Sequence, residues 1–530
     1  MPGHRDSITS ASDWVGGLMG SHVVIDARVK CGACAKIVVA LLTTALLAEA
    51  SLAFEVTWNG VPLSVHPARV SAVPMNQVWT GYQRPVEQTA AASFVSFDMS
   101  SPGDLAIAPD DAERKGDPVI LPLSYAPQIR REGGTYVLRV EEPRQFVIFF
   151  GKGAPPLHVF ANSTFDAPRG GDEIVFGPGE HHVGALFPKS GQTIRIEEGA
   201  VVYGAIFVAH ARGVKIAGRG IVDGSYLDRA DSNSTVYKRA VAAGLVDGPY
   251  GAAMAVTTFS CAWATNVLVE GVTFRNPPRW TMIVRAHSKD VTIDNVKIIG
   301  CWRYNSDGIN VCSSEDVSIR NSFIRAFDDC IVARGAYLDG DEGPTRNILV
   351  ENCVLWCDWG KNCEVWAGDK PCLIENVKFR GIVCAQVGTT IACDVTTWYG
   401  SSDTRIRNVV FEDIELDFAY PRMSEHYQRS PTDVKYRGGE MRSCSAFVVN
   451  SEKFGRNLGN QKFSPTEDLS GFHARYEDIA FRRMRILGDA PPDIKGRIDA
   501  SPASLTIDGV TLDDMPKEMK VEVLGDAVVR

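Results

Sequence analysis

A nine-residue pattern of alternating apolar and polar positions recurs along the middle of the chain. The clearest copies begin at Asn266, Asp290, Asp316 and Asn347, and weaker ones begin at Arg212, Pro371, Thr404 and Asp478. From Asn266 to Pro371 successive copies start 24, 26, 31 and 24 residues apart. Alternation turns one face of each copy inward, and a polar pair at its centre (Glu-Gly, Asp-Asn, Arg-Asn or Glu-Asn) bends the chain between two short strands.

A repeat of a little over twenty residues is typical of one coil of a solenoid. The Leu-x-x-Leu-x-Leu consensus of leucine-rich repeats is missing, and so is the 3.6-residue period of helical solenoids. We therefore predict an all-β chain in which residues 161–530 form a right-handed parallel β-helix.

Residues 54–160 have a different pattern. Short β-branched or aromatic runs, such as 136–140 and 145–150, are separated by Gly, Pro and Asp clusters. This spacing predicts a small β-sandwich ahead of the β-helix, with 151–156 as the linker.

The first 53 residues have the composition of a leader. Arg28, Lys30 and Lys36 precede an apolar run over 37–47, and Ser51-Leu52-Ala53 provides small residues for cleavage. This order is typical of a secretory signal peptide, and the run is short for a membrane span. We expect residues 1–53 to be removed near Ala53, which predicts a secreted or periplasmic protein without a membrane anchor; a buried helix is the alternative.

Charge, cysteine and histidine content narrow the possible partners and cofactors of the protein. The net charge of −9 over 530 residues argues against nucleic acid as a partner. Eleven of the 13 cysteines lie between Cys261 and Cys444 without a Cys-x-x-Cys pair, and the ten histidines show no metal-ligand spacing. We expect most of these cysteines to be small fillers of the solenoid interior, with one or two disulfides, and we expect no metal and no cofactor.

Three carboxylates are the strongest candidates for chemistry. Asp307, in the segment Asn-Ser-Asp-Gly, lies 21 residues before Asp328, and Asp329 follows directly. One coil of separation predicts that Asp307 and Asp328 stack on adjacent rungs, about 4.8 Å apart. A local bend is expected at Asp328 and Asp329, because in a regular strand one of them would be buried. Crowded carboxylates raise the pKa of at least one member, which yields a proton donor beside an ionised partner. The alternative is that both segments are ordinary turns.

These motifs resemble the active-site pattern of the glycoside hydrolase clan of polygalacturonases (family 28) and dextranases and isopullulanases (family 49). The resemblance covers about 155–420. The preceding sandwich, the segments at 158–162, 177–184 and 200–204, and the coil at 354–362 are similar to family 49. Pectin hydrolases carry Gly-His-Gly and Arg-Ile-Lys after the Asp-Asp pair. The matching stretches here are Trp-Gly-Lys-Asn at 359–362, which has no His, and Ile-Ala-Cys at 391–393, which lacks the cationic pair that would hold a uronate carboxylate. The resemblance therefore implies a neutral glycan, with a dextran-like α-glucan favoured and galacturonan disfavoured.

Aromatic and charged residues of the same coils are candidates for sugar binding. Trp302 and Tyr304 precede Asp307 and are the first choice as stacking platforms, followed by Trp359 and Trp366. Lys361 could touch substrate or an acid, and Glu364 could line the groove; for both, a surface position is the alternative.

We therefore predict an inverting hydrolase of a polysaccharide or oligosaccharide. Asp328 is the expected general acid, and Asp307 and Asp329 hold and activate water. A polysaccharide lyase is the second hypothesis, with Lys361 as the candidate base. A non-catalytic glycan-binding solenoid is the third, and it would tolerate loss of any of the three aspartates.

Overall fold

The computed structural model describes the following residues of the protein: 54–72, 86–110, 116–151, 155–170, 172–227, 257–336, 341–367, 371–387, 391–397, 403–418, 445–451, 473–491, 494–501 and 505–530. The expected leader, residues 1–53, and Cys444 lie outside them. No helix in these ranges is long and apolar enough to cross a membrane.

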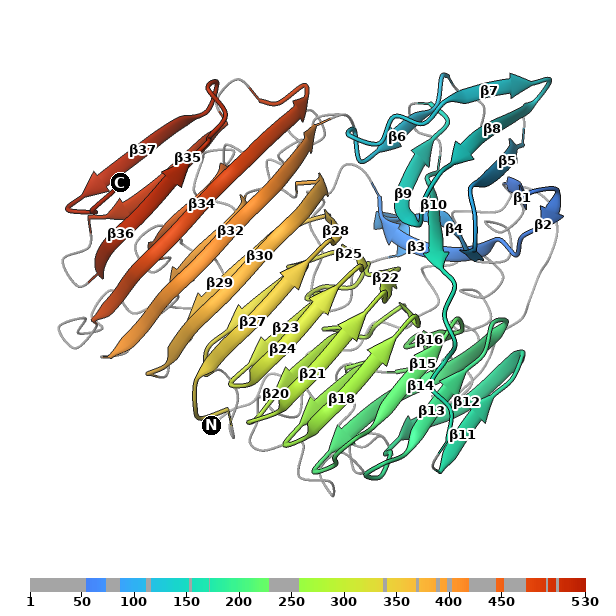
Figure 1. The fold of residues 1–530 in the computed structure, drawn as a ribbon, viewed down its shortest axis with the longest axis horizontal. Helices are drawn as coiled ribbons and strands as arrows, with labels where there is room; N and C mark the ends of the chain where they lie inside the picture. The colour runs from blue at the N-terminus through green and yellow to red at the C-terminus, as the bar shows by residue number, and fades with distance from the viewer. Residues whose placement is uncertain are drawn as a thin grey trace, which may run out of the picture. The chain divides into compact units, whose positions relative to one another are not determined.

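Two five-stranded sheets form the N-terminal part of the described chain (Figure 1). The first has the antiparallel order β2-β1-β5-β8-β7, with strands β1 (Phe54–Trp58), β2 (Val61–Pro62), β5 (Gly103–Pro109), β7 (Ile129–Glu132) and β8 (Thr135–Val140). The second has the order β3-β4-β10-β9-β6, with β3 (His66–Ser71), β4 (Thr89–Met99), β6 (Val119–Leu121), β9 (Arg144–Phe149) and β10 (Leu157–Ser163). A 3₁₀ turn, η2 (Val86–Gln88), precedes β4.

One apolar core joins these two sheets. Val56 and Leu105 of the first sheet belong to the same buried cluster as Phe146 and Val159 of the second. Burial of both inner faces in one cluster is the packing of a small sandwich. The last strand of this sandwich, β10, pairs in parallel with β4. The domain boundary between residues 160 and 161 stays a prediction.

The remaining strands form one 27-stranded sheet, in which each strand pairs in parallel with one that lies a coil further on (Figure 1). The first half comprises β11 (Glu173–Phe176), β12 (Gly179–Leu186), β13 (Thr193–Ile196), β14 (Ala200–Ala209), β15 (Lys215–Gly218), β16 (Ile221–Asp223), β17 (Phe259–Ala262), β18 (Thr265–Glu270), β19 (Thr273–Arg275), β20 (Met282–Arg285), β21 (Lys289–Asp294), β22 (Lys297–Ile299) and β23 (Ile309–Cys312). The second half comprises β24 (Glu315–Arg320), β25 (Phe323–Ala326), β26 (Ile331–Arg334), β27 (Thr345–Glu351), β28 (Val354–Cys357), β29 (Lys361–Ala367), β30 (Leu373–Gln386), β31 (Ile391–Thr397), β32 (Thr404–Phe418), β33 (Ser445–Ser451), β34 (Ala474–Gly488), β35 (Lys495–Ala500), β36 (Leu505–Asp513) and β37 (Lys520–Gly525). The predicted parallel β-helix is confirmed.

The start of each sequence repeat is a left-handed backbone position. Asn266, Asp290, Asp316 and Asn347 have φ between 55° and 58° and precede apolar residues that are aligned in register. Asn and Asp tolerate this conformation better than other residues with a side chain. Their side chains also link the coils, since the Asn347 amide donates to Asp316 at 2.8 Å. The repeat seen in the sequence therefore marks a recurring backbone irregularity as well as the alternation of faces.

The interior of the β-helix is apolar and contains nine of the described cysteines. All ten described cysteines are buried and free, so the expected disulfides are wrong for these residues. Burial raises the pKa of Cys261 to about 12 and that of Cys353 to about 12, which keeps these thiols protonated. Their role as small core fillers is confirmed.

Stacked phenylalanines fill the interior of the C-terminal coils. Phe411 lies between Phe379 and Phe481, with ring centroids 5.1 and 5.0 Å away and planes within 6° of parallel. We expect Phe411→Ala to lower the free energy of unfolding by about 3–5 kcal/mol, because it opens a cavity that the neighbouring coils cannot fill. Denaturant unfolding followed by circular dichroism measures the loss.

Val175 provides the control for this substitution. It is 42% exposed on β11, so Val175→Ala should change the same free energy by no more than about 0.5 kcal/mol. Equal losses in the two variants would contradict a stability that depends on the Phe411 stack.

Candidate active site

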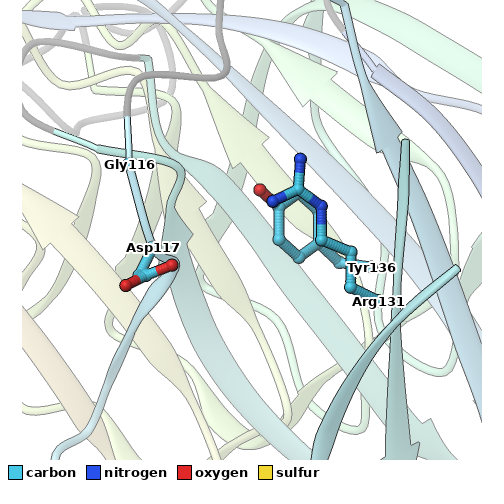
Figure 2. Close-up of a pocket in the computed structure, with 4 residues that line it drawn as sticks. All are labelled: Gly116, Asp117, Arg131 and Tyr136. Carbon is cyan, nitrogen blue, oxygen red and sulfur yellow. The ribbon is translucent and has the colours of Figure 1, made fainter. Parts of the chain in front are cut away.

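A pocket of the sandwich is lined by Gly116, Asp117, Arg131 and Tyr136 (Figure 2). The Arg131 guanidinium lies over the Tyr136 ring, 5.6 Å from its centroid. None of the predicted catalytic residues lines this pocket, and all three lie in the β-helix.

Two neighbouring strands of the β-helix present the three carboxylates at their starts. Asp307 comes just before β23, and Asp328 and Asp329 come just before β26. The register pairs Ile309 with Ile331, and the Gly308 amide donates to the Asp329 carbonyl at 2.8 Å. Asp307 therefore lies opposite Asp329. The expectation that it stacks on Asp328 is wrong by one residue, because sequence spacing alone does not specify where a coil turns.

The predicted bend at the Asp-Asp pair is present. The chain bends at Phe327 and Asp328, and both aspartates are partly exposed, whereas Asp307 is only 2% exposed. The buried Phe327 ring is nearly parallel to that of Trp359, with centroids 6.0 Å apart. Phe327 thus occupies the core and frees both carboxyl groups from it.

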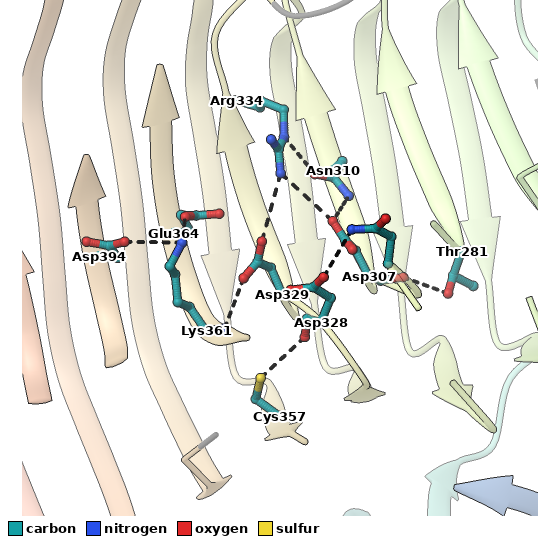
Figure 3. A network of polar contacts seen from close by, with 11 residues as sticks. Thr281, Asp307, Asn310, Asp328, Asp329, Arg334, Cys357, Lys361, Glu364 and Asp394 are labelled. Atoms are coloured by element: carbon teal, nitrogen blue, oxygen red, sulfur yellow. Dashed lines mark hydrogen bonds and ion pairs between the residues drawn. The ribbon is translucent and has the colours of Figure 1, made fainter. Parts of the chain in front are cut away.

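Each carboxyl group has its own polar partner (Figure 3). Asn310 Nδ2 donates to Asp307 Oδ2 at 3.1 Å, and Asn305 Nδ2 donates to Asp328 Oδ2 at 3.2 Å. The Lys361 backbone amide donates to Asp329 Oδ1 at 3.0 Å. These donors hold the three carboxyl groups in separate, defined orientations.

Gly360 closes the space behind the Asp-Asp pair. A Cβ at this position would lie 2.5 Å from Asp329 Oδ1 and 2.7 Å from Asp328 Oδ1. Only glycine leaves room for both carboxyl groups, which explains why glycine precedes β29 here.

Burial and mutual repulsion raise the pKa of two members of the cluster, Asp307 and Asp328. Burial, and next the charge of Asp329, raises the pKa of Asp328 to about 7. Burial, with the charges of Asp328 and Asp329, raises the pKa of Asp307 well above its usual range. Three carboxyl groups so close together cannot all be ionised at neutral pH, and one of them is available as a proton donor.

Lys361 and Glu364 are buried on β29 and paired with each other. The Lys361 ammonium contacts Glu364 and also lies 3.4 Å from Asp394 Oδ2 on the next coil. Burial, and next the charge of Asp329, raises the pKa of Glu364 well above its usual range. The alternative, that these two residues lie on the surface, is therefore wrong. Their contact with substrate stays a prediction.

The aromatic candidates divide by burial. Trp302 is 5% exposed and Trp366 is 4% exposed, whereas Tyr304 and Trp359 are partly exposed. A ring this buried offers little face to a sugar, so the interpretation of Trp302 and Trp366 as open stacking platforms is corrected. Trp366 instead lies under the Arg334 guanidinium, 4.4 Å from its ring centroid.

Several neighbours of the carboxylates carried no predicted role. Asn305, Asn310 and Gly360 lie in or beside the motifs given above, whereas Arg334 and Asp394 were not singled out. Alternation along β26 would have turned Arg334 outward on the face of the Asp-Asp pair, since Ile331 and Ala333 point inward. No comparable sequence signal links Asp394 to the site, because its partner Lys361 lies one coil away.

The three aspartates lie in a part of the chain that is similar to a known family. Residues 205–428, which include all three aspartates, match the model of glycosyl hydrolases family 28. Over this part of the chain the protein is similar to glycosyl hydrolases family 28.

Curated relatives that match this chain include polygalacturonases. A polygalacturonase of Medicago sativa is 28% identical over 234 residues, which cover 42% of this chain and 51% of the relative. An exopolygalacturonase of Arabidopsis thaliana is 28% identical over 177 residues, which cover 28% of this chain and 41% of the relative. The chain thus spans about half or less of the length of these relatives.

A solved structure shares the fold over most of the chain. Dex49A from Penicillium minioluteum matches with a TM-score of 0.55 and 14% identity, covering 88% of this chain and 93% of its own. At this identity the likeness concerns the fold alone, so the expected closeness to family 49 stays a prediction.

Proposed function

We propose that this protein hydrolyses the glycosidic bonds of a polysaccharide, with Asp328 as general acid and the Asp307–Asp329 pair as the base that activates water. The observation that carries the proposal is the gathering of three carboxyl groups at the starts of two adjacent strands (Figure 3). Glycoside hydrolysis needs one protonated and one ionised carboxyl group on either side of the scissile bond.

Asp328 suits the role of the acid. A general acid must keep its proton near the working pH, and burial with the neighbouring Asp329 charge raises the pKa of Asp328 to about 7. The pKa of Asp307 is raised as well, but Asp307 is only 2% exposed, whereas Asp328 is partly exposed and can reach the leaving oxygen of a bound glycan.

We further propose that the substrate is a neutral glycan, for which a dextran-like α-glucan is the first candidate. Both cations of the cluster are engaged by protein carboxylates. Lys361 pairs with Glu364 and Asp394, and Arg334 lies 3.8 and 3.9 Å from Asp307 and Asp329. A uronate carboxylate would have to compete with these buried acids for either cation. Polygalacturonate is the second candidate, favoured by the names of the curated relatives.

A substrate panel separates the candidates. We expect the purified protein to release reducing ends from a neutral glycan, and to act on polygalacturonate at least tenfold more slowly. The Asp328→Asn variant, purified in the same way, controls for contaminating hydrolases. Comparable rates on polygalacturonate would overturn the neutral-glycan proposal and establish the second candidate.

The same panel addresses the two other hypotheses. A lyase would form an unsaturated, ultraviolet-absorbing product, and a glycan-binding solenoid would bind without turnover. Export to the periplasm or the medium and removal of residues 1–53 belong to the proposal as predictions.

A further inference from the structure

Arg334 is the buried cation at the centre of the candidate site. It is the last residue of β26, is 6% exposed, and lies between two indole rings, 4.8 Å from the Trp280 centroid and 4.4 Å from the Trp366 centroid. Its Nε donates to Asn310 Oδ1 at 3.0 Å. Two rings and one hydrogen bond fix the direction of the guanidinium.

One nitrogen of Arg334 faces two carboxyl groups on adjacent coils (Figure 3). Nη2 lies 3.8 Å from Asp307 Oδ2 and 3.9 Å from Asp329 Oδ2. Asn310 links the same groups, since it accepts from Arg334 and donates to Asp307. The carboxyl group of Asp328, by contrast, accepts from Asn305.

Building on the function proposed above, we propose that Arg334 is a positioning residue that keeps a negative charge on the Asp307–Asp329 pair and so leaves the proton of the cluster to Asp328. The asymmetry of the contacts carries this inference. Arg334 also lowers the pKa of Asp328, but it lies against Asp307 and Asp329 and therefore favours the anion most on those two. Arg334 acts through the aspartates, and no contact with the reacting sugar is required of it.

Other charged or titratable groups surround this cation and set the background against which it acts. From the described flanking strands and turns they include Asp328, Lys361, Glu364, Asp394, Cys301, Cys312 and Cys357. Asp328 and Glu364 add negative charge that opposes ionisation of the pair. Lys361 is engaged by Glu364 and Asp394, and its charge lowers the pKa of Asp328, which acts against retention of the proton there. Arg334 is thus the cation in contact with the pair itself.

The proposal predicts a change in pH dependence. Without the cation, the Asp307–Asp329 pair binds a proton more readily, so the ascending limb of kcat against pH moves to higher pH. For Arg334→Gln we expect a shift of about one to three pH units, together with a lower kcat at the wild-type optimum. Arg334→Lys retains the charge, although it loses the planar stacking. Its ascending limb should therefore lie close to the wild-type pH.

Arg285 provides a matched control. It occupies the same outward position on β20, two coils before Arg334, is 3% exposed, and pairs with Asp341 at 2.9 Å. Arg285→Gln also removes a buried, ion-paired arginine, so it should lower the melting temperature without moving the ascending limb. If Arg334→Gln loses activity equally at all pH values and its ascending limb stays in place, the proposed role of Arg334 is overturned. The proposed hydrolytic function is not affected by that result.

A second measurement needs no turnover. In protein labelled at aspartate carboxyl carbons, the resonances lost in Asp307→Asn and Asp329→Asn identify the pair. We expect at least one of them to titrate at higher pH in Arg334→Gln, and in Arg334→Lys to titrate near its wild-type value. Unchanged titration would overturn the role of Arg334, whereas a wild-type protein without activity on any glycan would overturn the proposed function instead.

Discussion

Asp328→Asn is expected to lower kcat on the polysaccharide by about 10²–10⁴-fold, since it removes the proton that the leaving oxygen must receive. The loss should shrink for an aryl glycoside whose leaving group departs without protonation. The descending limb of the pH profile should disappear as well. We expect wild-type activity to fall as pH rises through about 7, because burial and the Asp329 charge raise the pKa of Asp328 to about 7. Steady-state rates on both substrates across pH measure all three effects.

Asp290→Asn is the matched control for this variant. Asp290 has φ 55°, a left-handed conformation that Asn also tolerates, and it lies on a different strand, β21. Its replacement should leave kcat and the pH profile unchanged. An Asp328→Asn enzyme with near-normal activity, or one with equal losses on both substrates, would remove Asp328 from the role of acid.

Asp329→Asn is expected to lower kcat by a similar or larger factor, and here the aryl glycoside should bring no recovery. Asp329 belongs to the pair that takes the proton of the attacking water, and this step is needed whatever the leaving group. Asp307→Asn should behave in the same way, because Arg334 joins the two carboxyl groups. The contrast between leaving groups distinguishes the base side of the cluster from the acid side.

The stereochemistry of the product tests the same arrangement. We expect inversion, in which water is held between the acid and the base, and inverting carboxyl groups lie roughly 6.5–9.5 Å apart. Proton NMR of the first-formed sugar reads the anomeric configuration before it equilibrates. A retained configuration would make one aspartate a nucleophile and would contradict the role proposed for the Asp307–Asp329 pair.

Much of the architecture follows from local sequence. The alternation in segments such as 290–298 predicts which face is buried, because successive side chains of a strand point to opposite sides. The Asn or Asp that opens each repeat, such as Asn266 and Asp316, predicts a recurring irregularity that only a few residue types tolerate. The adjacent aspartates 328 and 329 predict a bend, because burying either one would cost too much free energy.

The sequence did not predict the register between neighbouring coils. Coils differ in length, with repeats that start 24 to 31 residues apart, so a separation of 21 residues does not say which aspartate faces which. Hydrogen bonding between β23 and β26 decides that Asp307 lies opposite Asp329. A shift of one residue changes the partner of every side chain on a rung.

The sequence by itself determined the solenoid, the buried faces and the three aspartates proposed for chemistry, because these depend on local periodicity and residue type. The tertiary structure alone decided the partners of those residues. Arg334 meets Asp307, and Lys361 meets Asp394, across coils that only the parallel pairing brings together. Trp302 and Trp366 are buried for the same reason, since exposure depends on what packs over a side chain rather than on the side chain itself.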